Sequence, residues 1–287
     1  MKLLAFGEVL WDVYPDDRFI GGASLNFAAH CAKHGIKSYI LSSVGDDTLG
    51  EVTLQTLAQY DLQTDYVSVL PDKQTGKCLV TLDENSIPSY NLLTDVAWDE
   101  IRCQSAAKDA FDVLYFGTLA LRSPINQKNL KDLLKSNTFS DIFVDVNIRP
   151  PFYSAESVRF ALENGTVVKI SDEEFPTVAA VLGLPYTDDQ AENARSLAMR
   201  FPNIRLLLIT LGSKGALVLD TINGKLYTQP AAQAQPVSTV GAGDSFGAAF
   251  LAKLYAGAPL EACLKYATEV AALVVSRYEA IPDYQPF

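Results

Sequence analysis

The sequence predicts an α/β fold in which helices cover both faces of a doubly wound, mostly parallel sheet. Short apolar runs alternate along the chain with amphipathic segments, which is the order of a β–α–β fold. The runs are apolar at consecutive positions, as in strands that are buried on both faces. Residues 66–93 break this rhythm with strand patterns and no good helix, which indicates a small separate sheet. A length of 287 residues fits one large domain, residues 1–287, with such a small appendage.

The strands of the main sheet are expected where Val, Ile, Leu and Phe cluster in short runs. These runs are residues 3–6, 38–44, 113–116, 142–146, 167–170 and 206–209. Amphipathic periodicity predicts helices over residues 24–34, 48–60, 126–135, 187–200 and 259–277. Near the C-terminal half, residues 216–227 read as a hairpin around Asn223-Gly224, a dipeptide typical of a type I′ turn.

The small sheet is expected to be antiparallel. Its strand patterns are residues 66–69, 77–82 and 89–93. Turn signals separate them at Pro71-Asp72, at Asp83-Glu84-Asn85 and at Pro88.

Composition and charge exclude several classes of protein. The net charge is −11 and no dense Lys/Arg cluster occurs, which argues against binding to nucleic acid or to anionic membranes. No apolar run approaches the roughly 18 residues of a membrane span, and the acidic start does not read as a secretory signal. Four scattered cysteines lack CxxC spacing, so no zinc site is predicted. We expect these cysteines to be reduced thiols in a cytoplasmic protein.

The most informative segment is Ser238-Thr239-Val240-Gly241-Ala242-Gly243-Asp244. Small residues precede a strongly helical stretch, so the glycines stand at a helix N-terminus. Free N–H groups and the positive end of the helix dipole meet there and favour a phosphate or a developing anion. The alternative is a plain glycine loop in which Asp244 only caps the helix.

Other motifs of nucleotide and hydrolase chemistry are absent from the sequence. No GxxxxGK[ST] loop occurs, the pair Gly241–Gly243 lacks the third glycine of GxGxxG, and no GxSxG is present. His30 and His34 stand four residues apart on a predicted helix, but no third metal ligand accompanies them.

A second glycine-rich segment, Gly21-Gly22-Ala23-Ser24-Leu25-Asn26, also opens a predicted helix. Asp12 lies upstream of it, after the first strand. Ligands of open α/β sheets collect outside the carboxyl ends of the strands, so these groups could converge on one polyol. From the local pattern alone, helix capping by Ser24 beside a solvated Asp12 is the favoured interpretation.

Together these segments resemble the PfkB, or ribokinase-like, carbohydrate kinases. The first family signature is matched by residues 21–26 and the second by residues 238–251. Between them, residues 44–50, 115–120 and 145–150 are similar to further family segments, the last two in forms typical of fructokinase-like members. Two signatures in the right order and spacing make the resemblance specific, and it covers nearly the whole chain.

The resemblance implies a ribokinase-like domain with a small β-sheet lid over the sugar. The lid would be formed mainly by residues 66–93 plus part of residues 10–20. In this family the lid often serves as a dimer interface, so a homodimer through the lid is one expectation. The implied partners are a small-molecule sugar and ATP.

The resemblance also implies roles for individual residues. Asp244 would be the catalytic base that takes the proton of a sugar primary hydroxyl, with Gly241, Ala242 and Gly243 stabilising the transferring phosphate. The sugar-binding residues would be Asp12, Gly21, Gly22, Ser24, Asn26, Asn147 and Arg149. The ATP-binding residues would be Lys169, Ser171, Thr210, Gly212, Ser213 and Gly215. Glu174 would position Mg²⁺ through water.

Two departures from the family pattern bear on potassium activation. The family often has Asp where Ser238 stands and Gly-Ala where Glu279-Ala280 stands, and in many members these loops build a monovalent-cation site. Ser supplies no charge to such a site, so we do not expect potassium to activate this chain as it does its best-known relatives.

Fructose is the first choice of substrate, from residues 119–120 and 147–151. Ribose, 2-keto-3-deoxygluconate, another ketohexose or a nucleoside stay open. A phosphorylated sugar ranks lower, because only Arg149 and Arg122 stand near the expected site segments. Two other classes are a catalytically inactive sugar- or nucleotide-binding regulator and a NAD-binding oxidoreductase; the intact Gly241–Asp244 segment opposes the first, and the missing GxGxxG opposes the second.

Overall fold

The computed structural model describes residues 1–82 and 88–287. Within this part of the chain, no helix is long and apolar enough to cross a membrane. The turn expected at Asp83-Glu84-Asn85 lies outside the described residues.

The predicted α/β class is confirmed by a nine-stranded main sheet. Across the sheet the order is β13 (Lys225–Gln229), β12 (Ala216–Asp220), β11 (Leu206–Thr210), β10 (Val167–Ser171), β9 (Asp141–Asp145), β8 (Val113–Gly117), β1 (Lys2–Phe6), β4 (Lys37–Gly45) and β5 (Gln63–Leu70). The neighbours from β11 to β5 pair in parallel, whereas β12 is antiparallel to both of its neighbours.

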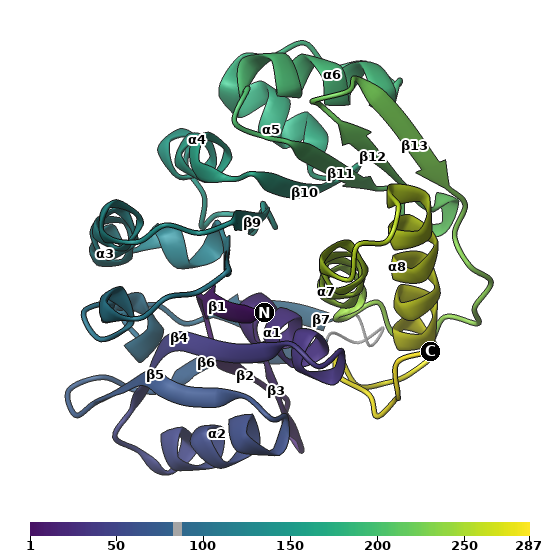
Figure 1. Ribbon diagram of the computed structural model, residues 1–287. Helices are drawn as coiled ribbons and strands as arrows, with labels where there is room; N and C mark the ends of the chain where they lie inside the picture. Colours follow the sequence, from purple (N-terminus) through teal and green to yellow (C-terminus); the bar gives the residue numbers. More distant parts are fainter. Residues whose placement is uncertain (83–87) are drawn as a thin grey trace.

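Helices cover both faces of this sheet, and an apolar core lies between the sheet and the helices on each face. One core contains residues of α1 (Ala23–Lys33), α2 (Thr48–Gln59), α7 (Ala242–Tyr255) and α8 (Leu260–Val275). The other contains residues of α3 (Pro124–Ser136), α4 (Ala155–Asn164), α5 (Phe175–Leu182) and α6 (Gln190–Arg200). Figure 1 shows α3 to α6 grouped apart from α1, α7 and α8. Short 3₁₀ turns stand at Ala97–Asp99, Ala106–Lys108, Leu119–Arg122 and Gly212–Lys214.

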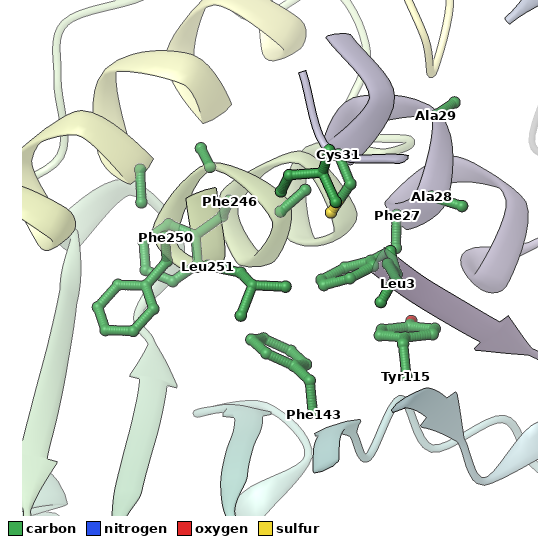
Figure 2. Packing of buried hydrophobic residues seen from close by; sticks show 14 of the residues in the cluster. Leu3, Phe27, Ala28, Ala29, Cys31, Tyr115, Phe143, Phe246, Phe250 and Leu251 are labelled. Carbon is green, nitrogen blue, oxygen red and sulfur yellow. The ribbon is translucent and has the colours of Figure 1, made fainter. Parts of the chain in front are cut away.

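The first of these cores extends to the strands below α1 and α7. Phe27 of α1 stacks on Tyr115 of β8 with ring centroids 4.0 Å apart, and Phe143 of β9 packs against both rings (Figure 2). This aromatic layer fixes α1 over the middle of the sheet, because large buried rings tolerate little displacement.

A second, four-stranded sheet has the order β3 (Arg18–Gly21), β2 (Leu10–Val13), β6 (Gly76–Leu82) and β7 (Pro88–Leu92). The expectation that residues 66–69 belong to it is wrong, because they lie in β5 at the edge of the main sheet. An edge strand is partly exposed to solvent, and all positions of β5 before Leu70 are half-buried or exposed. Its sequence pattern therefore resembles that of a strand in a small sheet. The small sheet is also mixed, since β2 pairs with β6 in parallel.

The predicted hairpin of β12 and β13 is present, but its turn is not of type I′. The loop between Asp220 and Lys225 has four residues, and of these only Gly224 has a positive φ, of 67°. A type I′ turn requires positive φ at both central residues. Instead, the carboxylate of Asp220 accepts hydrogen bonds from the N–H groups of Ile222 and Asn223 and closes the loop.

The strand order reverses direction at β1. The chain runs from β1 outward to β4 and β5, and then returns to β8 on the other side of β1. In open α/β sheets the ligand crevice lies outside the carboxyl ends of the strands at such a switch point. The segments after β1, β8, β9 and β10 therefore meet where a ligand is expected.

Candidate active site

Asp244 lies in the first turn of α7, which begins at Ala242 with Gly241 as its N-cap. The alternative that Asp244 only caps the helix is therefore wrong. One carboxylate oxygen, Oδ2, accepts a hydrogen bond from Asn26 Nδ2 at 2.8 Å. Burial, together with the nearby charge of Asp145, raises the pKa of Asp244 to about 7. A carboxyl group that titrates near neutrality suits a general base.

The turn before Asp244 can only be built with glycine at its start. Gly241 has φ 78°, and a Cβ there would lie 2.5 Å from the carbonyl oxygen of Ala280. The turn therefore packs directly against the C-terminal segment. Gly243 follows in the first turn of α7, where helix N–H groups lack intrahelical partners and face outward. The predicted residues Gly241, Ala242 and Gly243 thus surround one helix N-terminus, a favourable place for a phosphate.

The N-terminus of α1 faces the same place and carries Asn26. Gly22 has φ 114°, and a Cβ there would lie 2.4 Å from the carbonyl oxygen of Glu8, so only glycine fits. Glu8 Oε1 accepts a hydrogen bond from the Ala23 N–H at 2.9 Å. The hydroxyl of Ser24 is buried and donates to the Glu8 carbonyl, so it holds the loop together instead of facing the crevice.

Lys169, in the middle of β10, forms a buried ion pair with Asp145, at the carboxyl end of β9. Lys169 Nζ lies 2.7 Å from Asp145 Oδ2. Burial would lower the pKa of Lys169, but the charges of Asp145, Glu174 and Asp244, together with the hydrogen bond to Asp145, outweigh burial and the pKa is raised. A Cβ on Gly243 would lie 3.2 Å from Lys169 Nζ, so this ammonium stands beside the first turn of α7. The structure thus places Lys169 with Asp244 and not with the predicted loop of residues 210–215.

Arg149 and Asp12 face the same crevice. Burial raises the pKa of Asp12, and the positive charge of Arg149 lowers it. Burial raises the pKa values of Glu8, Asp145 and Asp244, and the same arginine charge opposes this rise. Arg149 is exposed, so its guanidinium is accessible to a ligand. Gly21 stands beside Asp12, since a Cβ on Gly21 would lie 3.4 Å from Asp12 Oδ2.

Glu174 joins the segments that follow β9 and β10. Its Oε1 accepts a hydrogen bond from the Ile148 N–H at 2.5 Å, and its Oε2 accepts from the N–H and the hydroxyl of Ser171, both at 2.8 Å. Asn147, next to Ile148, has a left-handed backbone with φ 42° and a half-buried side chain. Glu174 therefore fixes the loop that carries Asn147 and Arg149 relative to β10.

The remaining predicted ATP residues follow β11. Thr210 ends that strand beside Ser171, with which it pairs. Gly212 and Ser213 are exposed in a short 3₁₀ turn, and the N–H of Leu211 donates to the carbonyl of the buried Gly215 at 2.8 Å. Thr210, Gly212, Ser213 and Gly215 thus lie at the carboxyl end of β11 and in the short loop that leads to β12.

Three buried residues at the site were not singled out by the sequence. Glu8, Tyr115 and Asp145 are 4%, 0% and 2% exposed. Neither the Tyr115 hydroxyl nor Asp145 Oδ1 has a hydrogen-bond partner within the described residues. The signal that could have found Glu8 and Asp145 is an acidic residue at or just after the end of a predicted apolar strand, the position that the switch point makes accessible.

Comparison with known proteins agrees with this geometry. The family model for pfkB family carbohydrate kinases matches residues 15–286. A ribokinase of Bacillus subtilis is 27% identical over 262 residues, which cover 91% of this chain and 82% of the relative. A fructokinase of Klebsiella pneumoniae is 27% identical over 270 residues, covering 89% and 85%. The crystal structure of a sugar kinase from Pyrococcus horikoshii in complex with ATP superposes on this chain with a TM-score of 0.80. The two sequences are 25% identical, and the match covers 98% of this chain and 93% of the other.

The fold and the site define a phosphotransferase that acts on a small alcohol. The match to the family model over nearly the whole chain makes the assignment specific: this protein belongs to the PfkB family of carbohydrate kinases. It is accordingly an ATP-dependent carbohydrate kinase with an alcohol group as acceptor.

Proposed function

We propose that this kinase phosphorylates a primary hydroxyl of a sugar, with fructose as the first candidate and Asp244 as the base. The observation that carries the proposal is the position of the Asp244 carboxyl. It lies in the first turn of α7, next to the free N–H groups of that turn, and its pKa is raised to about 7. Base and anion site therefore stand side by side, as in-line phosphoryl transfer requires.

The proton and the phosphate move in opposite directions across this turn. Asp244 accepts the proton of the sugar hydroxyl, the hydroxyl oxygen forms a bond to the γ-phosphorus of ATP, and the bond from that phosphorus to the β–γ bridging oxygen breaks to release ADP. The N–H groups of residues 241–243 and the Lys169 ammonium stabilise the negative charge on the transferring group. Asn26 holds Oδ2 of Asp244, which leaves Oδ1 to receive the proton.

The acidic groups near the turn fit a magnesium ion carried by ATP. Mg²⁺ prefers oxygen ligands and keeps several waters, and it would neutralise charge on the phosphates. Glu174 lies beside Asp145, whose Oδ1 is buried and has no hydrogen-bond partner within the described residues. We infer that Glu174 positions the ion through water. The ATP phosphates would lie over Ser171, Thr210 and the loop of Gly212, Ser213 and Gly215.

The sugar is proposed to bind between α1, the small sheet and the loop after β9. Asp12, Asn26, Asn147 and Arg149 supply its hydrogen bonds, and the backbone of Gly21 and Gly22 permits close approach. Ser24 contributes by holding this backbone in place, since its hydroxyl donates to Glu8. Ribose, 2-keto-3-deoxygluconate or a nucleoside are the other candidates for this site.

Arg122 supports an unphosphorylated sugar. Its guanidinium makes a two-pronged ion pair with Asp99, at 2.8 and 2.9 Å, and donates to the Leu93 carbonyl at 2.7 Å. It also stacks over Trp98 at 3.9 Å. These contacts occupy Nε and Nη2 of Arg122, and Nη1 is buried without a hydrogen-bond partner within the described residues, whereas Arg149 is the exposed arginine at the proposed sugar site.

We also propose that the small sheet pairs two copies of the chain. Phe19, Leu79 and Tyr90, on β3, β6 and β7, are 43%, 37% and 57% exposed. By the strand register, Phe19 and Tyr90 lie on one face of the small sheet and Leu79 lies on the other. The two exposed aromatic side chains on one face favour contact with a partner. Sedimentation equilibrium tests this pairing, and a monomer at all concentrations would contradict it.

The decisive experiment for the function is ADP formation by the purified protein over a panel of sugars with Mg-ATP. Asp244→Asn is measured in parallel, because Asn keeps the shape of the side chain but cannot accept the proton. We expect one sugar, fructose first, to drive turnover, and the variant to lose on the order of a hundredfold or more. ATP binding without turnover on any sugar would favour an inactive regulator, and NAD binding in place of ATP would favour an oxidoreductase.

A further inference from the structure

One turn after Asn26, helix α1 carries a second polar side chain, His30, which is fully buried. Its Nε2 lies 2.9 Å from the carbonyl oxygen of Ala280, and its Nδ1 lies 2.8 Å from the hydroxyl oxygen of Tyr284. Both partners belong to the C-terminal segment that follows α8. Both ring nitrogens are therefore engaged, which removes His30 as a metal ligand.

The partners determine which nitrogen carries the proton. A carbonyl oxygen only accepts, so Nε2 carries the hydrogen and donates it to Ala280, and Nδ1 accepts from the Tyr284 hydroxyl. Burial, together with the charges of His34 and Lys33, lowers the pKa of His30 to about 4. The ring is thus neutral near pH 7, and its roles as donor at Nε2 and acceptor at Nδ1 are the same throughout that range.

The carbonyl that His30 holds is also the group against which the catalytic turn packs. A Cβ on Gly241 would lie 2.5 Å from the Ala280 oxygen, 2.9 Å from its Cα and 3.0 Å from its Cβ. Gly241 is the N-cap of α7, so a shift of Ala280 moves the start of that helix. Close-packed backbone transmits such a shift because it has no void to absorb it.

We propose that His30 is a positioning residue of the kinase. By holding the Ala280 carbonyl, it sets the Gly241–Asp244 turn over the sheet, while Asn26 on the same helix holds the Asp244 carboxylate. His30 touches neither sugar nor ATP. The proposal rests on the proposed role of the turn as the site of phosphoryl transfer.

Two substitutions separate the two nitrogens of His30. His30→Gln places an amide near the position of Nε2 and keeps a donor for Ala280, whereas His30→Asn reaches only the position of Nδ1. We expect His30→Asn to lower kcat about tenfold, with KM for sugar and for ATP changed less than about threefold, because misplaced catalytic groups slow the chemical step. His30→Gln should restore kcat to within about threefold of the wild-type value.

His34 provides the matched control. It is the C-cap residue of α1, four residues after His30, and neither of its ring nitrogens has a hydrogen-bond partner within the described residues. His34→Asn and His34→Gln should therefore leave kcat unchanged. Equal losses in both His30 variants, a loss of kcat equalled by His34→Asn, or a change in KM alone would overturn the proposal.

A measurement that does not need turnover separates this proposal from the proposed function. Amide hydrogen exchange over residues 238–245 should become faster in His30→Asn and stay at the wild-type rate in His30→Gln. Tyr284→Phe, which removes one hydroxyl and keeps the Nε2 bond, should give a smaller change in the same direction and serves if His30→Asn does not fold. Unchanged exchange in both His30→Asn and Tyr284→Phe would overturn the proposal even if the kinase activity is confirmed. Faster exchange in these two variants would support the proposal even if no sugar is turned over.

Discussion

The two ends of strand β9 carry an aspartate each, and they have opposite surroundings. At the amino end, Asp141 accepts two hydrogen bonds from Arg205, both at 2.7 Å, and one each from Thr166 and Tyr255, at 2.8 and 2.9 Å. Burial would raise the pKa of Asp141, but these partners outweigh it and hold the pKa below its usual value. Both oxygens of this carboxylate thus accept hydrogen bonds from the protein itself.

At the carboxyl end, Asp145 has a single partner, Lys169, and its Oδ1 has none within the described residues. Burial raises its pKa, and Asp145 in turn raises the pKa of Asp244. A buried oxygen without a partner costs free energy, so the protein is less stable here than it could be. The difference indicates that the amino end of β9 serves stability and the carboxyl end serves chemistry.

The largest effect is expected from Asp244→Asn, which should reduce kcat by on the order of a hundredfold or more. The folded-state pKa, about 7, lies above the usual value of 3.8, so ionised Asp244 destabilises the fold at pH 8, and this cost vanishes as the pH falls below 3.8. We therefore expect the inactive variant to have a higher Tm than wild type at pH 8. A variant with a clearly lower Tm would contradict the inference that the ionised carboxyl of Asp244, like Asp145 beside it, reduces the stability of the fold.

Asp145→Asn should have the next largest effect, a loss in kcat of about 10- to 100-fold. It removes a charge that stands next to both Lys169 and Asp244, and so misplaces the ammonium beside the turn. Steady-state kinetics with Mg-ATP and the best sugar measure the loss. Full activity in this variant would show that the Asp145–Lys169 pair is only structural.

Asp141→Asn is the matched control at the other end of the same strand. It should leave kcat within about twofold and lower the free energy of unfolding by about 2–4 kcal/mol, because charge-assisted hydrogen bonds to Arg205 are lost. Urea unfolding followed by circular dichroism measures this. A strong loss of kcat in the folded variant would contradict the inference that the amino end of β9 serves stability and not chemistry.

The smallest effect is expected from Arg205→Lys. Lysine keeps the charge but cannot make the two-pronged contact with Asp141, so the free energy of unfolding should fall by about 1 kcal/mol without a change in kcat. No measurable change would mean that the Thr166 and Tyr255 hydrogen bonds suffice to hold Asp141.

Much of this site is predictable from the sequence, because its parts are local. The glycines at positions 21, 22, 241 and 243 indicate helix N-termini, and Asn26 and Asp244 follow them within a few residues. Asp145 and Glu8 gain their role from distant partners: Lys169 lies 24 residues from Asp145, and Ala23 lies 15 residues from Glu8.

The same reason explains the errors in the fold. Strand β5 has the pattern of a half-wet strand, and only its pairing with β4 shows that it closes the main sheet. His30 has its partners 250 and 254 residues away, so the sequence shows a histidine on a helix and nothing of its contacts. Local pattern predicts elements and capped turns, whereas pairing across the sheet requires the structure.

The most direct test of the account is the pH dependence of kcat/KM for the sugar at saturating Mg-ATP, in wild type and in Asp145→Asn. We expect kcat/KM to rise with pH to a plateau, with an apparent pKa near 7 in wild type, because Asp244 must lose its proton to act as the base. In Asp145→Asn the rise of kcat/KM should occur at lower pH, because a negative charge beside Asp244 is removed. A rise caused by the titration of ATP would occur at the same pH in both proteins. A wild-type profile that is flat between pH 5 and 8, or a rise that stays at the same pH in the variant, would contradict the assignment of Asp244 as the base.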